Sequence, residues 1–486
     1  MKKRAKGFFW GCMTVVFLAA GLWFLTKLME PENDYSKNEE FIEDSNKYEV
    51  LFFGNSHMLD AVFPLELWHD YGMISYNLAG SGLAIPSTYW VMKNALDISN
   101  PRLIVLDCYT VSLDVKDDED ERRKAMLHQQ MDYLPLNVNK LRMINDLVEK
   151  PEDKLEFAWD FTLYHERWQR LEQEDFERSL NIQKGAKIAL DVKPPREMAE
   201  RPRQTTELES VGVEYLRRAI EECQSREIEI LLTYLPFPAS EENWQEALCV
   251  ERIAQEYGVA CVNFLDMSVV DLEVDCSDEN SHLNGSGGRK VTNYIGQYIK
   301  EHYDIADHSG EEAYRDWDED YGRYTDYKVD TIRELESLNK WLMMLADPAF
   351  DCCLYVNAGS RMLDYEQYVN QVRNLAPGYA FPSLEEAIEQ EEDYFLLVDN
   401  KNGVIVEYCG EDGGEIETSF GRMVYTEKED GQKALYIGDS EESLLIDSGE
   451  NGEELTVQVL AIDNRNSAIV GKAEFGEMFK VNRSVR

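Results

Sequence analysis

An uncharged segment near the N-terminus places the strongest constraint on how this chain can fold. Residues 7–26 carry no charged side chain, and four lysines and arginines lie within the first six positions. About 20 apolar residues cross the hydrocarbon core of a bilayer as a helix, and a basic flank stays in the cytoplasm. We therefore predict that residues 1–29 are a basic tail and a single transmembrane anchor in the cell membrane, with the body extracytoplasmic. A cleaved signal peptide is the alternative, although Leu28-Met29-Glu30-Pro31 lacks the small residues of a cleavage site.

Length and composition exclude several classes of protein. The 486 residues predict two or three domains. Asp and Glu number 94 against 49 Lys and Arg, a formal net charge of −45. Such an acidic body repels nucleic acid and anionic lipid head groups, so we expect no nucleic-acid partner. The nine cysteines are irregularly spaced and match no metal-binding pattern, so we predict no metal, no cofactor and mostly buried free thiols.

Beyond the anchor, the hydrophobic pattern predicts a parallel sheet. Residues 30–47 are polar and acidic, and we expect a stalk there. From residue 48 onward, short apolar runs alternate with amphipathic helical patterns, which is typical of an α/β domain with helices on both faces of the sheet. We predict a flavodoxin-like domain over residues 48–303 with a helical insertion at 114–210. Its expected strands are residues 50–53, 74–77, 103–106, 228–234 and 259–262.

The C-terminal third has a different pattern. Residues 304–330 are acidic and tyrosine-rich with little apolar periodicity, and we predict a linker. A small β-rich α+β domain is expected over residues 331–486. Its signals are a helical apolar pattern from Leu335 to Leu345 and strand-like runs at 404–408 and 455–462. Nothing in this region suggests catalysis, and its role stays open.

One stretch of the parallel-sheet region carries a candidate nucleophile. The apolar run that begins at Tyr48 stops at Gly54, and Ser56 follows two residues later. Open α/β sheets place their chemistry at the carboxyl ends of their strands. A serine hydroxyl needs a base within hydrogen-bond reach, and His282 is the candidate, in a segment Ser281-His282-Leu283-Asn284 just before a predicted helix. The alternative is a serine that only caps a helix.

These two blocks together resemble the SGNH (GDSL-like) hydrolases, whose first block carries the serine and whose last block carries D-x-x-H. The closer likeness is to their membrane-anchored branch, which acylates cell-wall and exported polysaccharides. Residues 48–303 carry the resemblance. It implies that Ser56 is the nucleophile and that His282 is the general base.

The acid that orients His282 departs from the family pattern. The family places an Asp three residues before the histidine, and that position here is Glu279, with Asp278 one residue further back. We favour Glu279, and Asp278 is the alternative if the loop bulges by one residue. Both acids could instead be solvated loop carboxylates.

For the oxyanion hole, the resemblance implies two backbone N–H donors and leaves a third unfilled. Ser56 supplies one, and Gly80, in the segment that corresponds to the family's second block, is expected to supply the other, with Gly82 as the second choice. The family's G-x-N-D is replaced by Val105-Leu106-Asp107-Cys108-Tyr109. Tyr109 is a candidate substitute donor.

Further candidates for substrate binding are polar and aromatic. His57 and Asp60 lie beside the nucleophile, and we expect them to line the cleft, with His57 and Tyr109 as candidates for substrate binding. His165 and Arg167, next to Trp168, suit sugar hydroxyls and apolar sugar faces. A purely structural helix in the insertion, pinned by Trp168, is the alternative for that pair.

The resemblance implies a serine O-acyltransferase that passes an acyl group, most simply acetyl, through Ser56 to an exported glycan or cell-wall polymer. A membrane-bound O-acyltransferase is the implied partner. Two alternatives stay open: a carbohydrate esterase that uses water as acceptor, and a non-catalytic scaffold for polymer export.

Overall fold

The computed structural model describes most of the chain. The described residues are 2–29, 37–113, 124–125, 127–128, 131–132, 134–158, 168–169, 182–203, 206–279, 282–410, 412–428, 433–438, 443–445, 456–476 and 479–485.

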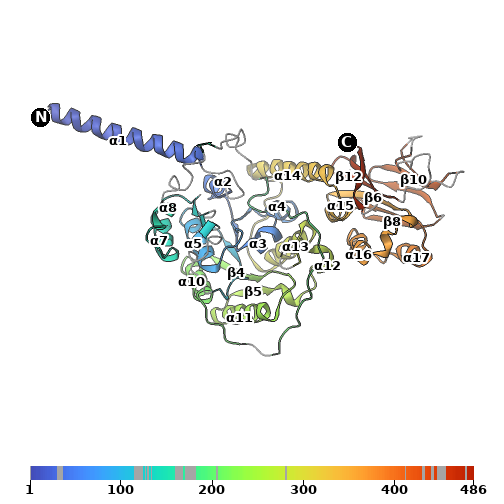
Figure 1. Cartoon of the computed structure of the whole chain (residues 1–486), viewed down its shortest axis with the longest axis horizontal. Coiled ribbons are helices and arrows are strands. Elements are labelled where there is room, and N and C mark those ends of the chain that lie inside the picture. The colour runs from blue at the N-terminus through green and yellow to red at the C-terminus, as the bar shows by residue number, and fades with distance from the viewer. Residues whose placement is uncertain are drawn as a thin grey trace.

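Helix α1 (Lys2–Met29) contains the predicted apolar segment. Its segment Phe9–Thr26 has a mean hydropathy of 1.8, and only 6% of that segment is buried against the rest of the chain. Figure 1 shows α1 projecting away from the rest of the chain. Among the described residues it is the one helix whose length and composition suffice to cross a membrane, a test that a signal sequence also passes.

The predicted stalk is in part a docked helix. Residues 37–44 form α2 (Lys37–Asp44), and its Phe41 is 3% exposed. The Phe41 ring stacks on Tyr48 at 5.6 Å between centroids and lies 5.5 Å from the Tyr76 ring. The stalk prediction is therefore wrong for residues 37–44, because the apolar side chain of Phe41, inside an acidic segment, packs α2 onto the parallel-sheet region.

The first sheet confirms the predicted fold class. Its five parallel strands follow the order β2-β1-β3-β4-β5, which is the flavodoxin-like order. The register pairs Val50 with both Ser75 and Leu103. The strands are β1 (Val50–Phe53), β2 (Ser75–Asn77), β3 (Leu103–Asp107), β4 (Glu229–Tyr234) and β5 (Ala260–Asn263).

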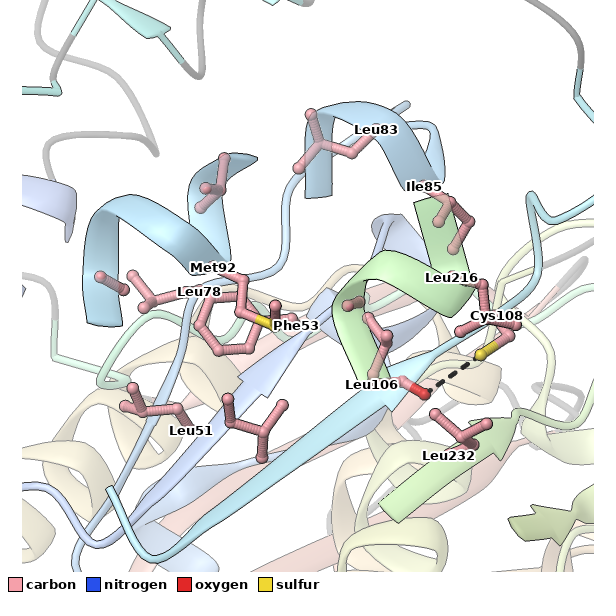
Figure 2. Close-up of a cluster of buried hydrophobic side chains, with 14 of the residues drawn as sticks. Leu51, Phe53, Leu78, Leu83, Ile85, Met92, Leu106, Cys108, Leu216 and Leu232 are labelled. Atoms are coloured by element: carbon pink, nitrogen blue, oxygen red, sulfur yellow. Dashed lines mark hydrogen bonds between the residues drawn. The ribbon is translucent and has the colours of Figure 1, made fainter. Parts of the chain in front are cut away.

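Each strand of this sheet is apolar on both faces because both faces are covered. In β1, Leu51 and Phe53 face one core while Val50 and Phe52 face the other. Figure 2 shows the first core, where Met92 and Leu216 close over the sheet. The helices on that side are α5 (Ile85–Leu96), α10 (Val211–Ser225) and α11 (Glu241–Tyr257). The helices on the other side are α3 (Ser56–Ala61), α4 (Pro64–Tyr71) and α13 (Gly285–His302).

The insertion and the loops complete this region. Helices α7 (Val138–Leu147) and α8 (Lys154–Ala158) belong to the predicted helical insertion, and α7 packs on α5. Residues 182–203 run without helix or strand. The short elements are η3 (Phe264–Asp266) and α12 (Leu272–Asp275).

The predicted acidic linker is largely helical. After η4 (Glu312–Tyr314), α14 (Arg315–Glu334) buries Trp317, Tyr324 and Lys328. The Lys328 ammonium lies 3.0 Å from Glu66 of α4 and 2.9 Å from Asp347. The linker prediction failed because this helix buries an ion pair and aromatic rings, which leave little apolar periodicity in the sequence.

The C-terminal region is the predicted β-rich part, and its sheets are antiparallel. A six-stranded sheet has the order β14-β13-β12-β6-β7-β8, and a three-stranded sheet has the order β11-β10-β9. One face of the larger sheet packs on the helices, and the other packs on the smaller sheet. The helices are α15 (Leu338–Leu345), η5 (Ala358–Ser360), η6 (Met362–Asp364), α16 (Glu366–Asn374) and α17 (Pro382–Gln390). The strands are β6 (Phe350–Val356), β7 (Tyr394–Asp399), β8 (Val404–Cys409), β9 (Gly414–Thr418), β10 (Gly421–Glu427), β11 (Lys433–Ile437), β12 (Val457–Asp463), β13 (Ala468–Phe475) and β14 (Val481–Val485).

Candidate active site

Ser56 sits on a tight turn at the carboxyl end of β1. Gly54 has φ +155°, and a Cβ there would lie 2.9 Å from the Cβ of Asp107, so the turn requires glycine. Asn55 then caps α3 by accepting a hydrogen bond from the His57 N–H at 2.9 Å. These constraints place Ser56 as the first residue of α3, half-buried at the edge of the sheet.

His282 reaches the same edge from a loop that is fixed at both ends. The Ser277 N–H donates to the His282 carbonyl at 2.8 Å, and Cys276 pairs with Leu283 in a β-bridge. The Asn284 amide donates to the Val274 carbonyl at 2.7 Å. Its oxygen accepts two N–H groups at 3.1 Å and caps α13. The segment that follows Leu283 therefore holds the histidine loop against the helix.

The structure brings three candidate residues into one hydrogen-bonded chain. The Ser56 hydroxyl donates to His282 Nε2 at 2.7 Å, across 226 residues of sequence. His282 Nδ1 donates to the carboxylate of Asp278. The side chains of His282 and Asp278 are 29% and 35% exposed, so substrate can reach them. This is the order of hydroxyl, imidazole and carboxylate that serine hydrolases use.

The preference for Glu279 as the orienting acid is corrected by this geometry. Asp278 hydrogen-bonds the imidazole, whereas Glu279 is exposed. Sequence spacing favoured the residue three positions before the histidine. The carbonyl of Glu279 instead accepts the Arg196 N–H at 2.9 Å, and Asp278 is the carboxylate that reaches His282.

The predicted oxyanion donors differ in availability. Ser56 is at the first position of α3, where helix N–H groups lack a partner within the helix. The Gly80 N–H donates to the Gly54 carbonyl at 3.1 Å, so in this conformation it ties the two loops together and is not aimed at an oxyanion. Gly82, the second choice, is exposed in a turn with φ +69°.

An aromatic wall stands beside Ser56. His57 stacks on the half-buried Tyr109 at 3.9 Å between ring centroids, with an interplanar angle of 22°. Phe237 packs edge-on to both rings, 4.8 Å from His57 and 5.0 Å from Tyr109. His57 is only 4% exposed, so it lies beneath the predicted cleft rather than on its surface, and Tyr109 is the more accessible of the two.

Buried titratable groups surround the nucleophile. Burial, and then the nearby charge of His282, lower the pKa of His57 to about 3, so its ring is neutral. Burial raises the pKa of Asp60 to about 6, opposed by His282 and Lys187. Burial raises the pKa of Asp107 to about 7, opposed by hydrogen bonds from backbone N–H groups, including that of Leu235. Perturbed groups of this kind gather at functional sites.

Sequence reasoning missed two contributors to this site. Phe237 follows β4 in Pro236-Phe237-Pro238, and an aromatic residue between prolines after a strand is the signal that could have pointed to it. The second is the irregular segment 187–196, which crosses the edge of the sheet. Its N–H groups bond the carbonyls of Leu59 at 3.1 Å and Cys276 at 3.1 Å. That segment has no hydrophobic period that could have indicated its place.

Other predicted binding residues are not placed. His165 and Arg167 lie outside the described residues, and the neighbouring Trp168 is 62% exposed. Within the described ranges, no group of three His, Cys, Asp or Glu residues is placed so that it could hold a metal ion. A cavity of about 650 Å³ lies in the C-terminal region, between the end of β6 and α17.

Among known proteins, this chain shows a distant structural similarity. No family model matches the sequence, and a search of curated proteins gives no match. Among solved structures, the chain is similar to a Bacteroides fragilis protein described as a putative acylhydrolase. The identity is 12%, the TM-score is 0.29, and the match covers 56% of this chain and 99% of that one. A TM-score this low supports no inference about fold or function.

Proposed function

We propose that this chain is a serine-dependent acyl-transfer enzyme, with Ser56 as nucleophile, His282 as general base and Asp278 as the acid that orients the imidazole. The observation that carries the proposal is the continuous hydrogen-bonded chain from the Ser56 hydroxyl through His282 to Asp278. These groups come from two distant segments that meet at the carboxyl edge of a parallel sheet, which is where such folds place their chemistry.

In the proposed reaction, Ser56 Oγ attacks the carbonyl carbon of an acyl donor while His282 Nε2 takes the hydroxyl proton. The tetrahedral intermediate is stabilised by the Ser56 N–H. It collapses when His282 returns the proton to the leaving oxygen, which departs as an alcohol and leaves acyl-Ser56. An acceptor hydroxyl then attacks the acyl carbon of acyl-Ser56 and gives its proton to His282. The bond between Ser56 Oγ and the acyl carbon breaks, His282 returns the proton to Oγ, and the acylated acceptor leaves.

The finer proposal concerns location and acceptor. A long apolar helix with a basic flank supports a membrane anchor, with the site on the extracytoplasmic side. The resemblance of the serine and histidine blocks to the SGNH acyltransferases supports an O-acetyl group as cargo and an exported glycan or cell-wall polymer as acceptor. We propose a membrane-bound O-acyltransferase as the partner that supplies the acyl group.

A carbohydrate esterase is the second candidate, favoured by the exposure of His282 and Asp278, which admits water to the base. The same Ser56 intermediate would then be resolved by hydrolysis. The engaged Gly80 N–H favours the third candidate, a non-catalytic scaffold, because a site with one backbone donor stabilises an oxyanion less well.

The test is intact-protein mass spectrometry of the full chain in detergent after incubation with an activated acetyl ester. We expect one acetyl adduct on the wild type, none on Ser56→Ala, and an adduct rate lowered at least about a thousandfold by His282→Ala. The lifetime of the adduct with and without oligosaccharide separates a transferase from an esterase.

Ser225→Ala is the matched control, since this exposed serine at the end of α10 bonds only a backbone carbonyl of its own helix among its described contacts. It should acylate like the wild type. A folded wild-type protein that never forms an adduct would overturn the enzyme proposal in favour of the scaffold.

A further inference from the structure

Lys37 is a buried cation that serves no purpose in the proposed reaction as described so far. It is the first residue of α2, eight positions after the end of α1, and it is 1% exposed. Its ammonium donates to the carbonyl of Asn77 at 3.3 Å, to that of Gly185 at 3.0 Å and to that of Ala79. An ammonium has three donors, and burying it is tolerable only when hydrogen bonds replace water.

The carbonyls that Lys37 holds belong to the loop beside the nucleophile. The Ala79 carbonyl is part of the same peptide group as the Gly80 N–H, which donates to the Gly54 carbonyl at 3.1 Å. Gly54 lies two residues before Ser56. A cation on a peptide oxygen polarises the peptide and strengthens donation from its N–H. Lys37 is thus linked to the Ser56 turn through one peptide group and two hydrogen bonds.

The same ammonium joins a third segment to that loop. Gly185 follows Lys184, whose carbonyl accepts the Asn77 N–H at 3.0 Å. A Cβ at Gly185 would lie 2.0 Å from the Asn77 carbonyl oxygen, so the two backbones touch only because this residue is glycine. Three parts of the chain therefore converge on one buried charge: the end of β2, the irregular segment 182–203 and α2.

Helix α2 is held in place independently of the Lys37 ammonium. Phe41 packs against the Tyr48 and Tyr76 rings, and the Tyr76 hydroxyl donates to the Lys37 carbonyl at 2.8 Å. The half-buried Lys184 lies 3.5 Å from Glu40 of α2 and 2.6 Å from Asp320 of α14. Removing the Lys37 ammonium therefore leaves other contacts that keep the helix docked.

We propose that Lys37 is a positioning residue for the Ser56 site, so that α2, the helix that carries Lys37, contributes to the geometry of that site. This proposal rests on the function proposed above. The Lys37 ammonium fixes the Ala79–Gly80 peptide, and the Gly80 N–H fixes the Gly54 turn that presents Ser56. Misplacing a reacting group by about 1 Å costs roughly a hundredfold in rate, so losing the ammonium should slow Ser56 acylation by roughly 10- to 100-fold.

The experiment compares the wild type, Lys37→Met, Lys37→Arg and Glu40→Gln as full chains in detergent. Acylation of Ser56 by an activated acetyl ester is followed by intact mass, over a range of ester concentrations, to separate the maximal rate from the half-saturating concentration. Hydrogen exchange of the segment 77–83 reports whether the Gly80 N–H stays protected. We expect Lys37→Met to lower the maximal rate, leave the half-saturating concentration within about twofold and expose the Gly80 amide, while Lys37→Arg restores part of both.

Glu40→Gln is the control, because it neutralises the carboxylate that faces Lys184 and leaves the Lys37 ammonium in place. It should match the wild type in both measurements. A folded Lys37→Met protein that acylates at the wild-type rate overturns the positioning role, even if exchange at Gly80 rises. If the wild type forms no adduct, the function proposed for Ser56 fails, and exchange alone decides: unchanged protection in Lys37→Met refutes the link to the loop, and lost protection supports it.

Discussion

In the antiparallel C-terminal region, buried carboxylates are enclosed by donors. Asp399 accepts the N–H of Asn402 at 3.0 Å and that of Ser419 at 2.7 Å. Glu407 accepts the Ser383 N–H at 2.7 Å and the Tyr394 hydroxyl at 2.8 Å. Among the described residues after 331, one buried side-chain polar atom, Gln371 Oε1, has no hydrogen-bond partner.

The carboxyl edge of the parallel sheet contrasts with this. Both ring nitrogens of His57, Oδ2 of Asp107 and Oγ1 of Thr233 are buried there without a hydrogen-bond partner. An unsatisfied buried polar group costs about 1–3 kcal/mol, and native proteins keep few of them. The cost is concentrated where β1, β3 and β4 end, next to Ser56. The C-terminal region thus satisfies nearly all of its described buried polar groups, whereas the carboxyl edge of the parallel sheet retains unsatisfied ones that reduce stability.

The largest expected effect at the carboxyl edge of the parallel sheet is a loss of acylation rate on replacing Asp278. Replacing it with Asn should lower the acylation rate by roughly 10²- to 10⁴-fold, because the amide no longer holds the tautomer that lets His282 accept the Ser56 proton. Thermal unfolding should stay within a few degrees of the wild type, since the side chain is 35% exposed. Rates from stopped-flow ester hydrolysis measure the loss.

Glu279→Gln is the matched control for that substitution. It alters the neighbouring exposed carboxylate and should leave the rate within about twofold. A larger loss in Glu279→Gln than in Asp278→Asn would return the orienting role to Glu279.

The next effect is a pH-dependent gain in stability from Asp107→Asn. Burial raises the pKa of Asp107 to about 7, so between about pH 4 and pH 7 the folded protein holds a proton that the unfolded chain has released. Wild-type stability therefore falls as the pH rises through that window. The amide cannot ionise, so the variant should be more stable than the wild type above pH 7 by on the order of 2–3 kcal/mol. Denaturant unfolding at pH 5 and pH 8 measures the difference, and an equal difference at both values would contradict the assignment.

The smallest expected effect is a loss of stability from Asp463→Asn in the C-terminal region. Burial alone would raise the pKa of Asp463, but hydrogen bonds and the charge of Arg465 lower it. This carboxylate therefore adds stability at neutral pH that is lost in acid, the reverse of Asp107. Asp463→Asn should cost about 1–2 kcal/mol at pH 7 and less near pH 3, without changing Ser56 acylation. A change in the acylation rate would show that the C-terminal region influences the Ser56 site.

Much of the parallel sheet follows from local sequence. The runs at 50–53 and 103–106 predicted strands because both faces of such a sheet are covered, so every residue in them is apolar. Ser56 and His282 were singled out because a strand that stops at glycine and a histidine that precedes a helix cap are both local signals. Their 2.7 Å contact confirms that the two segments meet; the catalytic roles stay predictions.

The predictions that failed concern features that depend on contacts between distant segments of the chain. Whether Asp278 or Glu279 reaches the imidazole depends on how the loop is tied to Ser277 and to the Arg196 N–H, and spacing within the loop does not encode this. The partner of the Gly80 N–H depends on how closely the Gly54 turn approaches. Helix α14 was missed because Lys328 is buried by ion pairs with Glu66 and Asp347, and a buried charge carries no hydropathy signal.

The place of Lys37 has a consequence for proteolytic release. A protease that cuts between Met29 and Lys37 would separate the apolar helix from a body that keeps Lys37 and the three carbonyls that its ammonium bonds among the described residues. A cut only a few residues further along would remove that ammonium and free a body whose Ser56 turn has lost its support. Under the proposed membrane anchoring and acyl transfer, the cleavage position would decide whether the released body is active or inert, and the two positions differ by less than one turn of a helix.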